Sequence, residues 1–291
     1  MIKTKNPKRI SFTPLRYPGG KTFLYTFFSD VIASHGWKNV VYIEPYAGGA
    51  GAALALLVLE KVDRIIINDY DPAIYAFWNS VVNKSDDFIR LLEITPTTVE
   101  EWGRQKAIYK AADLSDLLSL GFATFFLNRT NRSGILNAGP IGGKAQTGNW
   151  KIDARYNRSN LIDKIKLISL YKERITVENE DGASIVKKYG NDKGSFFYID
   201  PPYFVKGAEL YLNAFKQSDH QRLADVLAEF ADAKWLLSYD NEQAIVDLYP
   251  NFDYEVFSLN YSANHNTRSG DELMIYSSAI QKESIYDTST L

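Results

Sequence analysis

The sequence predicts an α/β fold built on a mostly parallel sheet. Seven short runs of β-branched and aromatic residues have the composition of strands, and helical patterns lie between most of them. This alternation is typical of a parallel sheet that carries helices on both faces. The last two strands are joined by the polar turn 264–271, which is too short for a helix, so we expect an antiparallel hairpin there. The predicted strands are 40–45, 64–68, 174–179, 196–200, 234–239, 254–260 and 272–277.

Five helices are predicted from the spacing of apolar residues between these strands. Ser218 and Asp240 stand at the start of the last two helices, where we expect them to act as capping residues. Asp71 stands directly before Pro72, which makes it the expected cap of the third helix. The predicted helices are 21–34, 51–61, 72–83, 218–231 and 240–249.

The regular alternation breaks once, between Asn83 and Tyr171. This interval begins with helical stretches at 85–93, 97–112 and 114–127, and it continues as a loop rich in Gly, Asn and Arg over 128–157. The break predicts an inserted, mostly helical domain at 84–171, which separates a first part (1–83) and a second part (172–291) of the main domain.

The composition excludes several classes of protein. The chain of 291 residues contains no cysteine, which removes disulfides, thiolate zinc sites and catalytic thiols. His35, His220 and His265 show no metal-ligand spacing, so we expect no metal site and interpret them as surface or cap residues. No apolar run approaches the ~18 residues of a membrane span, and the first residues lack the pattern of a signal peptide. We therefore expect a cytoplasmic protein that does not bind membranes.

Basic residues are concentrated in two stretches, although the formal net charge is −2. The first 21 residues carry six Lys and Arg and no acid, and residues 129–174 carry ten Lys and Arg against three acids. Nucleic-acid binding depends on where charge lies rather than on its sum. A solvated surface is the alternative explanation for either stretch.

A glycine-rich turn follows the first predicted strand. The strand runs through Glu44 into Pro45, and Gly48, Gly49 and Gly51 then precede a helix. Glycines let the backbone approach a ligand closely, and the N–H groups of the helix then point at it. We interpret the turn as a cofactor site, with packing alone as the alternative. Asp69 ends the second strand about 20 residues later, where a carboxylate accepts hydrogen bonds from a ribose.

The most informative pattern is Asp200-Pro201-Pro202-Tyr203, which follows the apolar strand 196–200. Two prolines cannot continue a strand ladder and stiffen the backbone, so the Asp200 acceptor and the following carbonyls are held in place. Acceptors aimed at the hydrogens of adenine N6 favour its pyramidal, nucleophilic form, and the ring of Tyr203 can stack on the base. The pattern therefore favours methyl transfer to an adenine that is flipped out of a duplex.

Together, these motifs resemble those of the Dam-type DNA adenine N6 methyltransferases, the D12 class. The segment Pro14–Lys21 is similar to the first cofactor motif of that family, in which an aromatic residue precedes Gly-Gly-Lys. Residues 44–51 are similar to its glycine motif, and residues 200–203 to its catalytic motif. The resemblance implies S-adenosylmethionine as cofactor and double-stranded DNA as partner. It also implies a Rossmann-like methyltransferase sheet of seven strands, the last of them antiparallel.

The resemblance also implies roles for individual residues. Lys21 is expected near the carboxylate of the cofactor, and Asp181 near its adenine, although a surface turn explains Asp181 equally well. The expected catalytic residues are Asp200, Pro201, Pro202 and Tyr203. The expected cofactor-binding residues are Tyr17, Lys21, Glu44, Pro45, Gly48, Gly49, Gly51, Asp69, Asp181 and Asp200.

The inserted region resembles the target-recognition region of the family. Its Arg and Asn side chains suit the edges of guanine and adenine, and its Lys side chains suit phosphates. Its sequence differs from the hairpin of the GATC-specific members, so the DNA sequence that it recognises cannot be predicted. The expected DNA-binding residues are Arg129, Asn131, Arg132, Ser133, Asn137, Lys144, Lys151, Arg155 and Asn157. Tyr239 and Tyr261 follow later strands and are interpreted as walls of the base pocket or as ordinary packing.

Four other functions share part of this pattern. Cytosine N4 methylation usually has Ser at the position of Asp200, and methylation of a glutamine side chain has Asn. An NAD-dependent oxidoreductase accounts for the glycine turn and Asp69 but leaves the Asp-Pro-Pro-Tyr segment unexplained. A DNA-binding relative without activity is disfavoured because Lys21, Asp69 and Asp200 are all present. The sequence does not specify whether a cognate restriction nuclease acts beside the enzyme.

Overall fold

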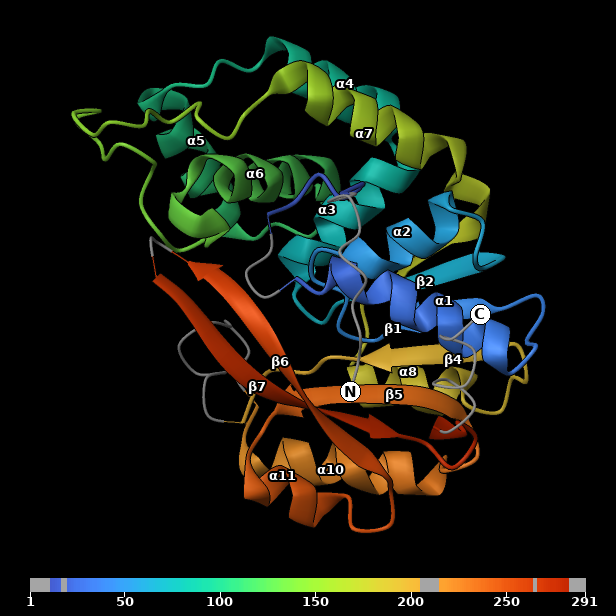
Figure 1. Ribbon diagram of the computed structural model, residues 1–291. Coiled ribbons are helices and arrows are strands. Elements are labelled where there is room, and N and C mark those ends of the chain that lie inside the picture. Colours follow the sequence, from blue (N-terminus) through green and yellow to red (C-terminus); the bar gives the residue numbers. More distant parts are fainter. Residues whose placement is uncertain (1–10, 17–19, 205–214, 264–265, 283–291) are drawn as a thin grey trace.

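A seven-stranded sheet with helices on both faces organises the chain in the computed structural model (Figure 1). The structure describes residues 11–16, 20–204, 215–263 and 266–282. The strands are β1 (Val41–Glu44), β2 (Arg64–Asn68), β3 (Ile175–Glu178), β4 (Ser195–Ile199), β5 (Lys234–Asp240), β6 (Tyr254–Ala263) and β7 (Asn266–Tyr276). All seven predicted strands are therefore confirmed.

The strand order is β3-β2-β1-β4-β5-β7-β6. Neighbours from β3 to β5 are parallel, and β7 is antiparallel to both β5 and β6, which confirms the predicted hairpin. The hairpin is longer than predicted, because β6 continues past residue 260 to Ala263 and β7 begins at Asn266, inside the predicted turn 264–271. An antiparallel ladder is held by backbone hydrogen bonds, so polar letters alone did not mark where it ends.

Alternate residues of each strand contribute to two separate hydrophobic cores. On one face, Tyr42 and Phe196 pack under η1 (Thr22–Leu24), α1 (Tyr25–Ser34), α2 (Gly51–Val58) and α3 (Pro72–Asn83). On the other face, Ile43 and Phe197 pack under α8 (Gly182–Tyr189), α10 (Gln217–Glu229) and α11 (Gln243–Leu248) (Figure 1). Both faces are covered, so the ends of the strands are the part of the sheet left for a ligand.

The predicted insertion is a group of helices that lies beyond α3, at the top of Figure 1. It consists of α4 (Ser85–Ile94), α5 (Val99–Ala111), α6 (Leu117–Thr130), η2 (Arg132–Gly134) and α7 (Arg158–Leu170), and η3 (Lys172–Arg174) leads back to the sheet. Its aromatic residues continue the core of the first face, where the rings of Phe77 and Phe125 stack at 6.0 Å. None of the helices in the described residues is both long enough and apolar enough to span a bilayer.

Two helices, α7 and α8, were missing from the sequence prediction. Helix α7 buries only Leu161, Ile165 and Ile168 among Lys and Asn residues, and α8 has just eight residues. Short or mostly polar helices depend on tertiary packing more than on their own periodicity. The basic residues of α7 had been counted only as part of the basic stretch 129–174.

Two of the predicted caps are wrong, and one is confirmed. Asp240 is the last residue of β5 and accepts the N–H of Phe204 at 3.0 Å, while α11 begins only at Gln243. Ser218 lies inside the first turn of α10, which begins at Gln217. Asp71 caps α3 as predicted, because it accepts the N–H of Ala73 at 2.8 Å. The two errors share a cause, since each element begins or ends a few residues from its predicted boundary.

Candidate active site

The carboxyl ends of the parallel strands bring several acidic side chains to one edge of the sheet. Glu44 ends β1, and Asp200 follows β4. Asp240 ends β5, and it lies opposite Glu272 of β7 in the antiparallel register. Asp69 follows β2 on the far side of β1. Among the described residues, Lys21 is the cation that pairs with the acids around Asp200: its ammonium contacts Asp200 and Glu272.

Asp200 is held in place by two neighbours. The Lys21 ammonium donates to both of its carboxylate oxygens, at 2.7 and 2.8 Å. The hydroxyl of Ser238, on the adjacent strand β5, donates to Oδ1 at 2.9 Å and is itself 2.8 Å from the hydroxyl of Tyr198. The side chain of Asp200 keeps 24% of its surface exposed, so its carboxylate remains open to a ligand at the edge of the sheet.

Tyr203 connects Lys21 with a second buried carboxyl group. Its hydroxyl accepts a hydrogen bond from the Lys21 ammonium at 2.6 Å and donates one to Glu272. The Lys21 Nζ lies 3.5 Å from the other oxygen of Glu272. Burial and the nearby Asp200 raise the pKa of Glu272 to about 7, although Lys21 and Tyr203 oppose the shift. Burial, Asp200 and Glu272 also raise the pKa of Tyr203 far above its usual range, which keeps the phenol neutral.

The glycine turn after β1 is fixed by the acid that follows β2. Gly48 has a left-handed backbone, with φ of 46°, and donates its N–H to Asp69 at 2.9 Å. Asp69 also accepts the N–H of Asp71 at 2.9 Å, so both of its oxygens are oriented. Burial raises the pKa of Asp69 to about 7. The predicted pairing of a glycine turn with an acid at the end of the second strand is therefore present.

Glu44 lies beneath this turn and is 5% exposed. Its Oε1 accepts the hydroxyl of Tyr42 at 3.1 Å and the N–H of Ala53, in the first turn of α2, at 3.0 Å. Burial raises its pKa to about 8, and Asp200 adds to the shift. The same turn lies close to the Lys21 segment, since a Cβ at Gly51 would stand 2.1 Å from the Thr22 hydroxyl oxygen.

Asp181 acts as the cap of α8. Its Oδ1 accepts the N–H groups of Ala183 and Ser184 at 3.1 and 3.3 Å, and Arg222 donates to both of its oxygens at 2.8 Å. Burial would raise the pKa of Asp181, but the hydrogen bond and charge of Arg222 outweigh it and leave the pKa below its usual value. Asp181 thus has the hydrogen bonds of a capping residue, as the alternative interpretation of a surface turn expects.

The insertion brings basic side chains together with the segment that precedes Lys21. Arg129 donates to the backbone carbonyl of Arg155, and Lys164 donates to the carbonyl of Thr13 at 2.9 Å. Burial, together with the charges of Arg16 and Arg155, lowers the pKa of Arg129 to about 10. Mutual repulsion of this kind shows that positive charge is concentrated here.

The predicted DNA-binding residues divide into buried and exposed ones. Asn131 is fully buried: its amide accepts from the Trp102 indole at 2.6 Å and donates to the carbonyls of Ile135 and Leu136. It therefore shapes the loop and leaves no surface for a base edge, which corrects that prediction. Arg129 is half-buried, and the exposed members are Arg132, Ser133, Asn137, Lys144, Lys151, Arg155 and Asn157.

Some expectations changed, and some fall outside the described residues. Tyr17 and His265 lie outside them, and the side chain of Tyr261 is not described. Tyr239 is fully buried in the second core, where its hydroxyl lies 2.7 Å from His220, so it packs rather than lines a pocket. His220 is 1% exposed and was wrongly expected at the surface or in a cap.

Glu272 is the site residue that sequence reasoning missed. Its signal was a carboxylate at the start of the apolar run Leu273–Tyr276, where strand burial makes an acid unusual. Ser238 directly precedes Tyr239 in the sequence, and its hydrogen bond to Asp200 was not anticipated.

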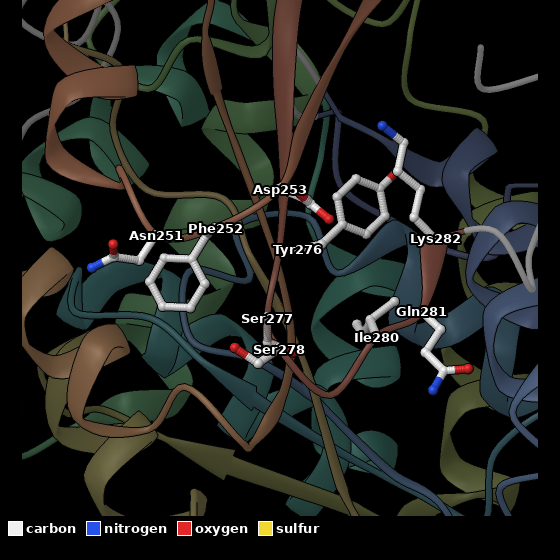
Figure 2. A pocket seen from close by; sticks show the side chains of 9 residues that line it. All are labelled: Asn251, Phe252, Asp253, Tyr276, Ser277, Ser278, Ile280, Gln281 and Lys282. Carbon is white, nitrogen blue, oxygen red and sulfur yellow. The ribbon is translucent and has the colours of Figure 1, made fainter.

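A separate hollow of about 280 Å³ lies at the other end of the sheet, lined by residues within 251–253 and 276–282 (Figure 2). Tyr276 lies opposite Leu236, near the start of β5, whereas Asp240 at its far end lies opposite Glu272. The hollow is therefore remote from Asp200 and takes no part in that site.

The sheet and its edge define a class of protein. A parallel sheet closed by an antiparallel β7 between β5 and β6, with a glycine turn after β1 and an acid after β2, is a Rossmann-like fold of the methyltransferase type. The sequence model of the family described as D12 class N6 adenine-specific DNA methyltransferase matches residues 17–263. The chain belongs to this family, and its reaction is methylation of adenine N6 in DNA. Membership selects adenine over the alternatives considered above. No curated protein matches the chain.

Proposed function

We propose that the edge of the sheet around Asp200 is where adenine N6 receives its methyl group, from S-adenosylmethionine and with the base flipped out of the duplex. The observation that carries the proposal is the Asp200 carboxylate itself. It is fixed by Lys21 and Ser238 at the end of β4, partly exposed, and one strand away from the glycine turn that follows β1. An oriented acceptor beside a nucleotide-type turn is what methylation of a nucleobase amine requires.

The residues at this edge fit S-adenosylmethionine. Asp69 is oriented beside the turn as an acceptor for ribose hydroxyls. The carboxyl groups of Asp69, Asp200 and Glu272 lie at this edge, and their negative charge in the ionised form favours a cationic ligand over a phosphate. S-adenosylmethionine supplies a methyl group on a positively charged sulfonium. The residues proposed to hold it are Tyr17, Lys21, Glu44, Pro45, Gly48, Gly49, Gly51, Asp69, Asp181 and Asp200.

The proposed catalytic residues act on the adenine amine. The Asp200 carboxylate and the Pro201 carbonyl accept its two hydrogens, which reduces the conjugation of the nitrogen lone pair with the ring. Pro202 stiffens the backbone that carries these acceptors. Tyr203 is fixed through its hydroxyl by Lys21 and Glu272, so its ring is a rigid surface on which the base stacks. Stacking and hydrogen bonds offset the few kcal/mol of flipping the base.

We further propose that the insertion 84–171 is the target-recognition domain and that 1–83 and 172–291 form the catalytic domain. Two observations support this division. The basic side chains cluster on the insertion, and Asn128 of α6 holds Arg16 through bonds to its N–H and carbonyl at 2.7 and 2.8 Å. Bases read by the insertion would thus lie near the segment that carries Lys21. The proposed contacts are Arg129, Arg132, Ser133, Asn137, Lys144, Lys151, Arg155 and Asn157.

Digestion of the reaction product tests the site and the donor together. The protein is incubated with labelled S-adenosylmethionine and unmethylated double-stranded DNA, and the nucleosides are separated by mass spectrometry. We expect the label in N6-methyl-2′-deoxyadenosine. Asp200→Ala should abolish transfer, because loss of the charge-assisted hydrogen bond to the amine alone lowers the rate roughly 10- to 100-fold. S-adenosylmethionine should still bind in a calorimeter.

The matched control is Asp192→Ala, which removes an exposed carboxylate at the opposite end of the same strand. It should retain normal transfer. Near-normal turnover by Asp200→Ala would refute the catalytic assignment, and recovery of N4-methylcytosine would refute the base.

A further inference from the structure

The acceptor atoms that the proposed function needs are occupied by the chain itself. The Lys21 ammonium donates to both oxygens of Asp200, at 2.7 and 2.8 Å. An ammonium and an aromatic amine are both N–H donors, so they compete for the same lone pairs. Lys21 and Ser238 together use three of the about four lone pairs of the Asp200 carboxylate, so an incoming adenine amine competes with Lys21 for this acceptor.

The displaced ammonium has one other carboxylate within reach among the described residues. The side chain of Lys21 is only 3% exposed, and a buried ammonium without a counter-ion costs several kcal/mol. Glu272 lies 3.5 Å away and is equally buried. The hydroxyl of Tyr203 already joins the two, because it accepts from Lys21 and donates to Glu272.

We propose that Glu272 is a positioning residue of the transfer reaction, which takes over the Lys21 ammonium when the adenine amine occupies Asp200. This inference rests on the proposed role of Asp200 as the acceptor of the amine. It gives a function to a buried carboxyl group that the reaction does not otherwise use.

The fold makes this exchange a small movement. Glu272 is fixed in the sheet, since β7 pairs on one side with Asp240 of β5 and on the other with Phe257 of β6. Lys21 lies before η1 on a flexible four-carbon side chain. Shortening the gap from 3.5 Å to an ordinary ion-pair distance of about 2.8 Å is enough.

The charges around Glu272 link this exchange to pH. In the part of the chain that the structure describes, the ionisable groups that face it include Lys21, Asp200, Tyr203, Asp240 and Tyr198. Burial and the charge of Asp200 raise the pKa of Glu272 to about 7, so below that pH it is mostly protonated and neutral. The ammonium is attracted by the ionised form. Transfer should therefore become faster as the pH rises through about 7.

Glu272→Gln separates the charge from the shape of this residue. The amide still accepts the hydroxyl of Tyr203 but offers Lys21 no charge. With labelled S-adenosylmethionine and unmethylated double-stranded DNA, we expect kcat to fall roughly 10- to 100-fold, the range of a hydrogen bond to a charged group. Affinity for S-adenosylmethionine should stay the same, and the rise of kcat near pH 7 should disappear. Glu272→Asp should keep that rise and restore part of kcat.

Glu178→Gln is the matched control. Glu178 ends the edge strand β3 and also binds an ammonium and a phenol, those of Lys188 and Tyr189. Its replacement removes the same kind of interaction away from Asp200, so kcat and its pH profile should not change. A Glu272→Gln enzyme with the kcat and pH profile of the wild type would overturn the inference. If Asp200→Ala is inactive in the same assay, the proposed function survives that result.

A structure of the wild-type protein in complex with S-adenosylhomocysteine and a duplex that contains the target site tests the inference without any variant. We expect Lys21 Nζ to lie closer to Glu272 than to Asp200. An ammonium still bound to Asp200, or one that contacts the carboxylate of S-adenosylhomocysteine without contacting Glu272, would overturn the inference.

Discussion

At the scale of single residues, the orientation of Asp200 depends on Ser238 as much as on Lys21. The two contacts differ in kind, because Lys21 is a mobile cation and Ser238 is a fully buried hydroxyl on a central strand. Tyr198, whose hydroxyl lies 2.8 Å from that of Ser238, stands on the strand that delivers Asp200. When a donor replaces Lys21, Ser238 is the contact that keeps the carboxylate in one rotamer.

Removing that hydroxyl gives a prediction. Ser238→Ala should lower kcat on the order of tenfold, the value of one hydrogen bond to a charged acceptor, with little change in the affinity for S-adenosylmethionine. Initial rates at saturating DNA measure the effect. The matched control is Ser195→Ala at the opposite end of β4, because the buried Ser195 hydroxyl has no hydrogen-bond partner among the described residues. Equal rates for both variants would show that Ser238 does not position Asp200.

At the scale of elements, a close crossing joins α6 of the segment 84–171 to α3. A Cβ at Gly121 of α6 would lie 2.4 Å from the Ala76 carbonyl oxygen of α3, so the two helix backbones nearly touch. The stacked rings of Phe77 and Phe125 lie along the same crossing. The orientation of the basic loop relative to the sheet therefore depends on this one glycine.

Gly121→Ala tests the crossing. The new methyl group meets backbone atoms that cannot rotate away, so the free energy of unfolding should fall by roughly 1–3 kcal/mol. Gly103→Ala in the exposed interior of α5 is the control, since nothing lies within 4 Å of its Cβ position. That variant should gain roughly 0.5–1 kcal/mol through helix propensity. Thermal unfolding monitored by circular dichroism compares the two, and an equal shift in both would contradict the close approach.

The elements also show which parts of the site a sequence reveals. The glycine turn and the Asp-Pro-Pro-Tyr segment are contiguous in the chain, so their letters identified them and their strands. The contact between Lys21 and Asp200 joins residues 179 positions apart, and that between Tyr203 and Glu272 joins residues 69 apart. Such contacts depend on the order and register of the strands, which cannot be predicted from a short segment of sequence. Asn131 shows the reverse error, because a polar residue in a basic loop turned out to be buried.

At the scale of the whole molecule, charge is divided between two regions. Carboxyl groups gather at the edge that carries Asp69, Asp200 and Glu272, whereas the insertion and the sequence before Lys21 are rich in Lys and Arg, and the formal net charge is −2. Phosphates are attracted to the insertion and repelled from the acidic edge. This division favours entry of an uncharged base into the site while the backbone stays on the basic surface.

The division predicts how DNA affinity depends on salt. The logarithm of the affinity should fall linearly with the logarithm of the salt concentration, with a slope of about −0.9 for each phosphate contact. Lys144→Gln combined with Lys151→Gln removes two exposed cations of the insertion, so it should weaken binding and flatten the slope by about 1 to 2 units. Fluorescence anisotropy with a duplex of arbitrary sequence measures this, because phosphate contacts do not depend on sequence.

Lys61→Gln combined with Lys187→Gln makes the same change of charge outside the insertion and should leave the slope unaltered. Equal slopes for the two double variants would place the DNA on another surface, because counter-ion release counts only the phosphates that a protein neutralises.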